Sequence, residues 1–250
     1  MYKDTKIGIF IPLFNQESYI GEAIASAVCQ DYPNLELAAV DDCSTDNSRQ
    51  KVLDDMVDVE QKENYYCGRI NGLVCHLLIN ETNKGVSFSR NKAIQFLLNR
   101  GCEYVGNLDA DDQFLPNKIS KCASILDDDP LVSLVYHDIV LYHDAQKTFS
   151  HEFREPFSRE RLEQEDIINN MPLMRSRVIA EVGGYNCQMR TCEDYEFYTR
   201  MTVKNPATHI AEPLGIYRIT GKNTSDTISK EEWNKNWAMV RQSIQQQRGA

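Results

Sequence analysis

The chain has 250 residues and a formal net charge of −10, so its length suits one large domain or one domain with an appendage. Its 42% of hydrophobic and 26% of charged residues are ordinary for a soluble globular protein. The negative charge argues against nucleic acid as a partner, because binding phosphates needs clustered lysine and arginine.

The cysteines and the N-terminal segment bear on the cellular compartment. None of the eight cysteines forms a Cys-x-x-Cys pair, so a zinc site of the usual spacing is not predicted. Cys29, Cys75 and Cys122 lie in apolar segments and are predicted as small core residues, which favours a reducing compartment. The apolar run 7–14 contains a proline and is too short to span a bilayer. We expect a cytoplasmic protein, with peripheral association at the inner face of the membrane left open.

Strand and helix patterns alternate over the first half of the chain. Short β-branched runs are typical of buried parallel strands, and apolar residues three and four positions apart are typical of helices packed on such a sheet. The alternation predicts an α/β fold with a mostly parallel, doubly wound sheet. The predicted strands are 7–11, 35–40, 74–79 and 104–108. Two helices are predicted at 19–30 and at 87–99, and Gly101 ends the second of them. Between them a helix is predicted that Ser44, Thr45 or Asp46 caps and that turns Val52, Leu53, Met56 and Val57 inward.

The pattern loosens after residue 130. Residues 131–142 are predicted as a strand and residues 149–170 as a charged, irregular segment. The polar insertion 62–69 is predicted as an exposed loop. Residues 230–247 place apolar side chains at helical spacing, which predicts a helix docked on the domain. A contact for a partner or a membrane surface is the alternative for that helix.

Three aspartates crowd onto the turn that follows the fourth predicted strand. Asp109, Asp111 and Asp112 repel one another unless a cation lies between them, and oxygen ligands suit a divalent cation. A solvated acidic turn is the alternative, because Asp-x-Asp is common by chance. The polar residues that follow the first and second strands are Asn15, Asp41 and Asp42. Because parallel strands end at one edge of a sheet, these residues predict one candidate site.

Five short blocks stand in a fixed order between residues 6 and 220. They are Ile9 to Asn15, Val40 to Asp46, Asn83 to Ser87 with Arg90 to Ile94, Leu108 to Asp112, and Gly183 to Tyr185 with Cys192 to Phe197. Together they resemble the motifs of glycosyltransferase family 2. One block alone is a weak signal, whereas five in order are specific.

The resemblance implies a glycosyltransferase A-type fold and transfer of a sugar, with inversion, from a nucleotide-diphosphate donor to a hydroxyl. UDP is favoured as the nucleotide, and a glycan or lipid-linked molecule is expected as the acceptor. The catalytic domain would cover 1–225, with a nucleotide-binding half at 1–130, an acceptor-side half at 131–225 and a helical tail at 226–250.

The resemblance also assigns roles around the acidic turn. Asp111 would be the direct ligand of a divalent metal, Mn²⁺ or Mg²⁺; Asp109 would lie against the metal or the ribose, and Asp112 would be accessory. Asp42 would accept a hydrogen bond from the nucleobase. Either Asp41 or Asp42 could instead compensate a helix N-terminus.

Other donor-site residues follow from the same blocks. Pro12 and Asn15 would shape the wall around the nucleotide, and Gly85 would permit a tight turn. Lys84 and Arg90 would be the cations near the phosphates. The alternative for Lys84 and Arg90 is that they are solvated residues at the start of a helix and bind no phosphate.

Asp194 is the predicted catalytic base, because it matches the family's Glu-Asp pair and a single displacement needs one group to take the acceptor's proton. The alternative is that Glu193 and Asp194 only cap the helix that follows. We predict that Asp194→Asn abolishes transfer and that Asp111→Asn weakens metal-dependent donor binding.

The late part of the chain departs from the family pattern. Tyr217-Arg218-Ile219-Thr220 has threonine where family members often carry histidine, which puts the closure of the loop 219–226 in doubt. Neither a Gln-x-x-Arg-Trp motif nor a transmembrane segment is present, so a single addition is predicted rather than processive synthesis. A catalytically degenerate sugar-nucleotide binder and, less favoured, a sugar nucleotidyltransferase remain as alternatives.

Overall fold

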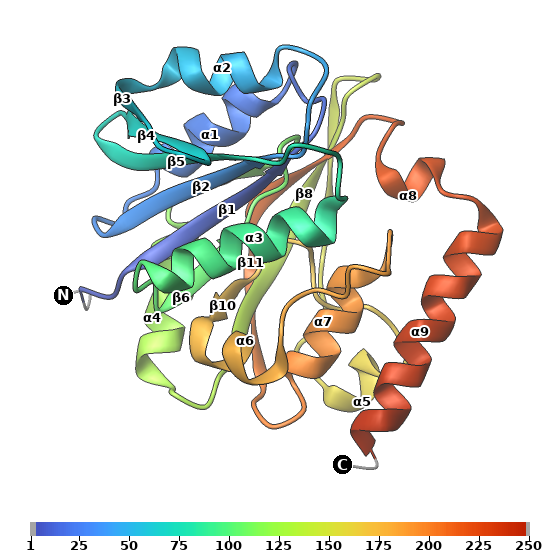
Figure 1. Cartoon of the computed structure of the whole chain (residues 1–250). Coiled ribbons are helices and arrows are strands. Elements are labelled where there is room, and N and C mark those ends of the chain that lie inside the picture. Colours follow the sequence, from blue (N-terminus) through green and yellow to red (C-terminus); the bar gives the residue numbers. More distant parts are fainter. Residues whose placement is uncertain (1–3, 249–250) are drawn as a thin grey trace.

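The computed structural model describes residues 4–248. In this part of the chain a single sheet of 11 strands has the order β3-β4-β5-β2-β1-β6-β10-β8-β11-β7, and β9 pairs with β8 outside this path (Figure 1). The strands are β1 Ile7–Leu13, β2 Leu35–Asp41, β3 Val57–Gln61, β4 Tyr65–Ile70, β5 Leu73–Ile79, β6 Tyr104–Asn107, β7 Gln113–Phe114, β8 Leu134–His143, β9 Thr148–Glu152, β10 Leu173–Arg175 and β11 Ala207–Ile219. The helices are α1 Ile20–Val28, α2 Ser48–Asp55, α3 Val86–Asn99, α4 Lys118–Asp128, α5 Arg159–Leu162, α6 Ser176–Val182, α7 Glu193–Met201, α8 Thr224–Thr227 and α9 Lys230–Arg248.

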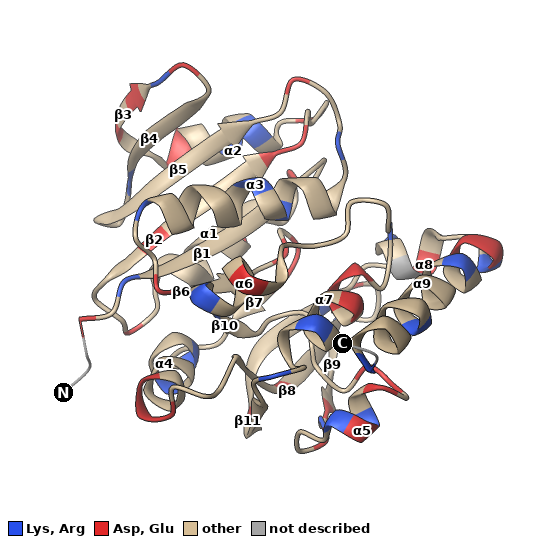
Figure 2. Ribbon diagram, turned by 60° about the horizontal axis from the view of Figure 1, so that its bottom comes forward, with Lys and Arg blue, Asp and Glu red and all other residues tan. Residues whose placement is uncertain are grey.

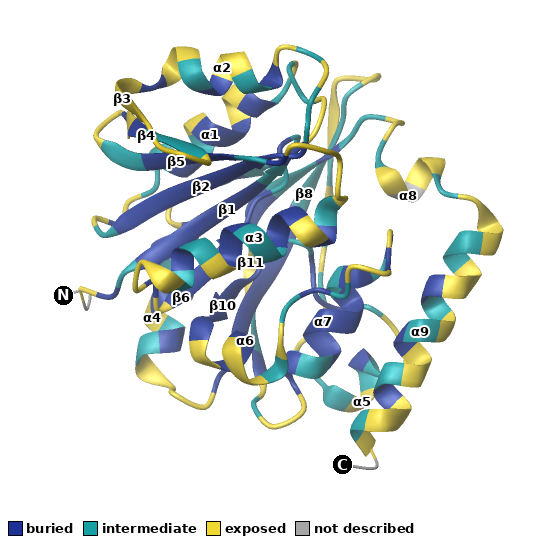
Figure 3. Ribbon diagram, in the orientation of Figure 1, coloured by how far each residue is buried: buried dark blue, intermediate teal, exposed yellow. Residues whose placement is uncertain are grey.

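The predicted α/β fold and its parallel strands are confirmed. β5, β2, β1 and β6 run parallel to one another, and Ile7 of β1 aligns with both Leu35 and Tyr104. Their carboxyl ends therefore lie along one edge of the sheet, where the predicted site residues are attached. The strand interiors are buried on both sides (Figure 3), which explains their almost uniformly apolar sequences.

Alternate side chains of β1 belong to two different hydrophobic clusters. Ile9 and Ile11 belong to the cluster that contains the buried residues of α1, α2 and α4. Phe10 belongs to the cluster that contains those of α3, α6, α7 and α9. A Cβ atom on Gly8 would lie 2.7 Å from a methyl of Leu97, so glycine is what allows α3 to approach β1 this closely.

The exposed loop predicted at 62–69 is wrong, as is the placement of Val57 in a helix. α2 ends at Asp55, and β3 and β4 form an antiparallel hairpin that extends the sheet beyond β5. β3 is exposed along its whole length because it is the edge strand. Its polar sequence therefore lacks the apolar pattern from which a strand is predicted. Tyr65 on the inner strand packs edge-on against His76 and Phe96.

The other elements agree with the predictions in part. β8 begins at Leu134, and β9 overlaps the start of the segment that was predicted to be irregular. Cys75 and Cys122 are buried as predicted, whereas Cys29 is exposed because it caps the end of α1 and does not lie on its inner face.

The C-terminal helix α9 is confirmed as a docked helix. Val240 and Ile244 are buried, and Trp237 meets Tyr195 of α7 edge-to-face with ring centroids 5.3 Å apart. None of the helices in residues 4–248 is both long and apolar enough to cross a bilayer.

Candidate active site

A cleft of about 670 Å³ opens at the carboxyl ends of the parallel strands, between the first turns of α3 and α7. The acidic first turn of α7 is visible in Figure 2. Most of the predicted site residues line the cleft, namely Pro12, Asp42, Lys84, Gly85, Arg90, Asp109, Asp111 and Asp194. Asn15 lies outside this lining, where its side-chain oxygen accepts hydrogen bonds from the backbone and hydroxyl of Thr45.

The carboxylate of Asp42 organises the loop that enters α3. Its Oδ1 accepts hydrogen bonds from Asn80 Nδ2 (2.7 Å) and from the Lys84 backbone (2.9 Å), and its Oδ2 accepts from the Gly85 backbone (2.8 Å). Gly85 adopts a φ of 87°, the left-handed region that favours glycine, in agreement with the predicted turn. The base-binding role of Asp42 stays a prediction, and its contacts already make it the anchor of this wall.

Arg90 joins the acidic turn to the first turn of α7. Its Nη2 donates to Asp109 Oδ1 at 2.8 Å, and its Nη1 donates to Glu193 Oε1 at 2.5 Å. The guanidinium is buried, and although burial alone would raise the pKa of Asp109, Arg90 holds that pKa below its usual range. The proximity of Arg90 to the donor phosphates stays a prediction, and its observed partners are carboxylates.

Removing this arginine tests how much the two carboxylates depend on it. Arg90→Met is expected to lower the free energy of unfolding by about 3 kcal/mol, because it leaves the buried Glu193 and the partly buried Asp109 without their cation. Urea unfolding measures the loss. Arg177→Met is the matched control, since that side chain is half exposed and 4.0 Å from its nearest acid, and its cost is expected to stay below about 0.5 kcal/mol. Equal losses in both variants would contradict the assigned role.

The remaining aspartates of the turn differ sharply in their surroundings. Asp112 is buried and accepts hydrogen bonds from Asn170 Nδ2 (2.8 Å) and from the Arg218 backbone (2.9 Å). Asp111 receives no hydrogen bond from any side chain in the described residues. Burial and the neighbouring charge of Asp109 raise the pKa of Asp111 to about 6.

Asp111 is therefore the carboxylate left for a cation. In residues 4–248 no group of three or more histidine, cysteine, aspartate or glutamate side chains is arranged to hold a metal ion. Asp109 is engaged by Arg90, Asn107 and Asn170. A protein ligand set this small fits a metal that takes further oxygen ligands from a bound diphosphate and water, as Mg²⁺ sites commonly do.

Asp194 lines the cleft from the second position of α7. Its Oδ1 accepts a hydrogen bond from the Tyr195 backbone at 2.8 Å, so it satisfies one of the free donors of the helix start. Cys192, and neither acid, occupies the cap position. The charge of Asp194 also acts on Asp166. Together with burial it raises the pKa of Asp166 well above the usual range.

The structure adds residues that sequence reasoning did not assign to the site. Asn170 binds both Asp109 and Asp112, and Arg218 donates from Nε to the carbonyl of Asp111 at 3.0 Å. These contacts join positions 58 to 107 residues apart, so no local pattern reveals them. Thr220 lies outside the cleft lining and donates its N–H and hydroxyl to Asn223.

The comparison with known families settles the family of the chain. Residues 8–182 match the model of "Glycosyl transferase family 2". The chain belongs to this family. The predicted resemblance is thereby confirmed.

Two relatives illustrate the range of the family. The chain is 26% identical to the chondroitin synthase of Escherichia coli over 239 residues, which cover 95% of this chain and 32% of that protein. It is 33% identical over 123 residues to the E. coli UDP-Glc:alpha-D-GlcNAc-diphosphoundecaprenol beta-1,3-glucosyltransferase WfgD, covering 49% of this chain and 42% of the relative. The matched segment thus covers less than half the length of either relative.

Solved structures show the same fold. The crystal structure of Staphylococcus aureus TarS 1–349 in complex with UDP-GlcNAc superposes with a TM-score of 0.75 at 20% identity, covering 96% of this chain and 66% of that one. The mannosyltransferase PcManGT of Pyrobaculum calidifontis, in complex with GDP-Man and Mn²⁺, superposes with a TM-score of 0.62 at 14% identity, covering 99% and 76%.

Proposed function

We propose that this chain transfers a sugar from a nucleotide-diphosphate donor, with UDP favoured, to a hydroxyl of a glycan or lipid-linked acceptor. The reaction inverts the anomeric carbon, depends on a divalent metal and adds a single sugar. The observation that carries the proposal is that one cleft is lined both by the carboxylate left for a cation, Asp111, and by a second carboxylate, Asp194. Arg90 ties the segments that bear them together through Asp109 and Glu193.

Each carboxylate has a distinct task in this reaction. Asp111, with Asp109 beside it, would hold Mn²⁺ or Mg²⁺, which neutralises the charge that develops on the leaving diphosphate. Asp194 accepts the proton of the acceptor hydroxyl while the oxygen of that hydroxyl forms a bond to the anomeric carbon. The bond between that carbon and the diphosphate oxygen breaks on the opposite face, and the nucleoside diphosphate leaves with the bonding electrons.

The comparisons support the choice of donor and acceptor classes. The name of WfgD specifies UDP-Glc and a diphosphoundecaprenol-linked acceptor, and TarS binds UDP-GlcNAc. PcManGT binds GDP-Man, so the fold alone does not fix the base. A lipid-linked acceptor would bring this protein to the inner face of the membrane, consistent with the proposed cytoplasmic location. We also keep the division at residue 225 between a catalytic domain and a helical tail as part of the proposal.

Thermal unfolding against a panel of nucleotide sugars tests the proposal. A ligand that binds only the folded state, at 100 times its dissociation constant, stabilises the protein by about 2.7 kcal/mol. We expect one UDP-sugar to raise the unfolding midpoint in the presence of Mn²⁺ and to lose that effect when EDTA replaces the metal. The UDP-sugar that gives this shift should release UDP when an acceptor is added.

Two outcomes would point elsewhere. A metal-dependent shift without any release of nucleoside diphosphate, across glycan and lipid-linked acceptors, would favour the degenerate binder. Absence of a shift with every donor in Mn²⁺ would remove the donor site itself from the proposal.

A further inference from the structure

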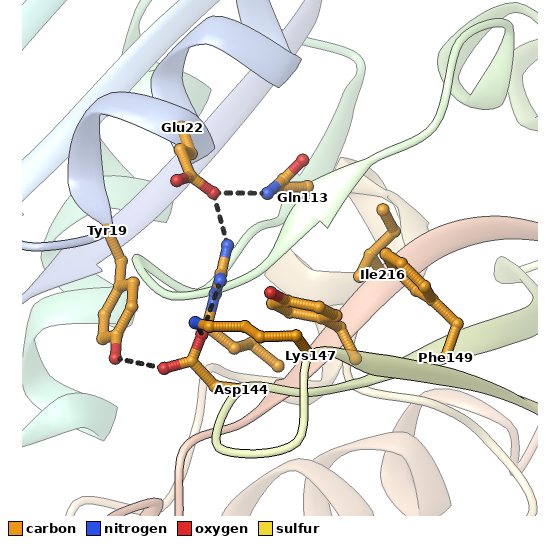
Figure 4. Close-up of a pocket in the computed structure, with 9 residues that line it drawn as sticks. Tyr19, Glu22, Gln113, Asp144, Lys147, Phe149 and Ile216 are labelled. Carbon is orange, nitrogen blue, oxygen red and sulfur yellow. Dashed lines mark hydrogen bonds and ion pairs between the residues drawn. The ribbon is translucent and has the colours of Figure 1, made fainter.

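A second cavity of about 370 Å³ lies outside the cleft, between the start of α1, the β8–β9 hairpin and β11 (Figure 4). Its size falls in the range of about 300–1,000 Å³ typical of small-molecule sites. Tyr217 lines the cleft, and the next residue, Arg218, lines the second cavity. The two hollows are therefore neighbours along β11, and the reaction proposed above makes no use of the second one.

The charged side chains of the second cavity neutralise one another. Arg218 pairs with Glu22 through Nη2, and its Nη1 lies 3.3 Å from Asp144 Oδ1. Lys147 Nζ lies 3.0 Å from the same carboxylate. Two cations thus face two anions, and all four are paired. A phosphate, a carboxylate or a metal ion would find no uncompensated opposite charge here, so the wall is suited to a neutral occupant.

The same wall still offers hydrogen bonds. Gln113 donates its amide N–H to Glu22 at 2.7 Å, which leaves the amide oxygen as an acceptor. Tyr19 donates its hydroxyl hydrogen to Asp144 at 3.2 Å, which leaves the phenolic oxygen as an acceptor (Figure 4). The ammonium group of Lys147 carries three donors, of which Asp144 takes one. A ligand with several hydroxyl groups can use donors and acceptors placed side by side.

Aromatic rings form the remaining wall. Phe149 pairs in register with Tyr142, which pairs in register with Arg218, so the three side chains form one row across β9, β8 and β11. The rings of Phe149 and Tyr142 are 4.8 Å apart, and Phe149 is 64% exposed. An exposed ring of this kind offers its electron-rich face to polarised C–H groups.

We propose that the second cavity binds a neutral pyranose unit of a glycan chain. A pyranose ring has an apolar C–H face, which would lie on Phe149, and equatorial hydroxyl groups around its rim, which would reach Gln113, Tyr19 and Lys147. Charge balance, adjacent donors and acceptors, and an exposed aromatic face all match this chemistry. Binding here is non-catalytic and does not require the proposed transfer, which bears only on whether the bound glycan is the acceptor chain or the product.

The test measures binding of neutral disaccharides by saturation-transfer NMR on the full chain, with and without UDP and Mn²⁺. The panel covers gluco-, galacto- and N-acetylhexosamine disaccharides. We expect at least one to bind both with and without UDP, and Phe149→Ser to weaken its affinity about tenfold, the scale of one lost aromatic contact. Phe153→Ser is the matched control, because Phe153 is a 77% exposed phenylalanine just beyond β9 that lies outside the lining of the second cavity.

Several results would overturn the inference. They are an absence of binding across the panel, binding that UDP displaces, and binding that Phe149→Ser and Phe153→Ser weaken equally. Binding of inorganic phosphate that depends on Lys147 would also overturn it, because the occupant would then be anionic. Failure of the proposed transferase function is distinguishable, since it would abolish the donor-dependent thermal shifts or the release of nucleoside diphosphate while leaving the Phe149-dependent sugar signal in place.

Discussion

Asp194→Asn is expected to lower the turnover number by about 10²- to 10⁴-fold, the range that a positioned general base contributes, while donor affinity is retained. Asparagine has the same shape and keeps an oxygen that can accept the hydrogen bond from the Tyr195 backbone, so the start of α7 is preserved. It cannot take a proton from the acceptor. The measurement is release of nucleoside diphosphate at saturating donor and acceptor, paired with donor titration by thermal unfolding.

A matched carboxylate controls for the loss of one negative charge. Glu181 lies on α6, half exposed and outside the cleft, and Glu181→Gln is expected to keep full turnover. Turnover of Asp194→Asn close to that of this control would remove Asp194 as the base. A loss of donor affinity together with turnover would indicate that Asp194 shapes the donor site rather than the proton transfer.

The sequence was sufficient to predict the strands that carry the site. Ile7–Leu13 is short, apolar and rich in isoleucine, and Leu35–Asp41 is a short run of mostly apolar residues, and such segments are typical of buried parallel strands. Once they are parallel, the polar residues after them meet at one edge. That geometric step, and no property of any single aspartate, is what brought Asp42 and Asp111 together.

Pairings across long sequence separations were beyond the reach of the sequence. Arg90 finds Glu193 at a separation of 103 residues, and nothing within one turn of α3 distinguishes it from a solvated arginine. The β3–β4 hairpin was missed for a related reason. An edge strand needs one partner and no apolar face, so Val57–Gln61 carries a loop-like composition while pairing through its backbone.

The contrast among the three aspartates of the turn is likewise a tertiary property. Asp109 is held by Arg90, and Asp112 by Asn170 and the Arg218 backbone, whereas Asp111 keeps a raised pKa and no side-chain donor in the described residues. Neighbouring residues of one type thus meet different surroundings according to which distant groups reach them, and the ligand role of Asp111 stays a prediction.

Asp111→Asn is expected to abolish the part of donor affinity that depends on metal. Loss of an outer-shell partner of a metal site costs about 10- to 100-fold, and loss of the direct protein ligand should cost at least as much. The measurement is the donor-induced shift of the unfolding midpoint as Mn²⁺ is titrated. Asp128→Asn, at an exposed aspartate at the end of α4, serves as the control and is expected to titrate like the unmodified chain.

The expected effect of Asp111→Asn on stability separates a loss of donor binding from a loss of folding. The pKa of Asp111 is raised in the folded chain, so its ionised form destabilises that state at neutral pH, and the neutral asparagine is expected to raise the unfolding midpoint in the absence of ligand. Lost donor binding could then not be attributed to a weakened fold. If Asp111→Asn kept the full dependence on Mn²⁺, the metal would belong elsewhere. If donor affinity fell equally with and without Mn²⁺, Asp111 would contact the donor itself.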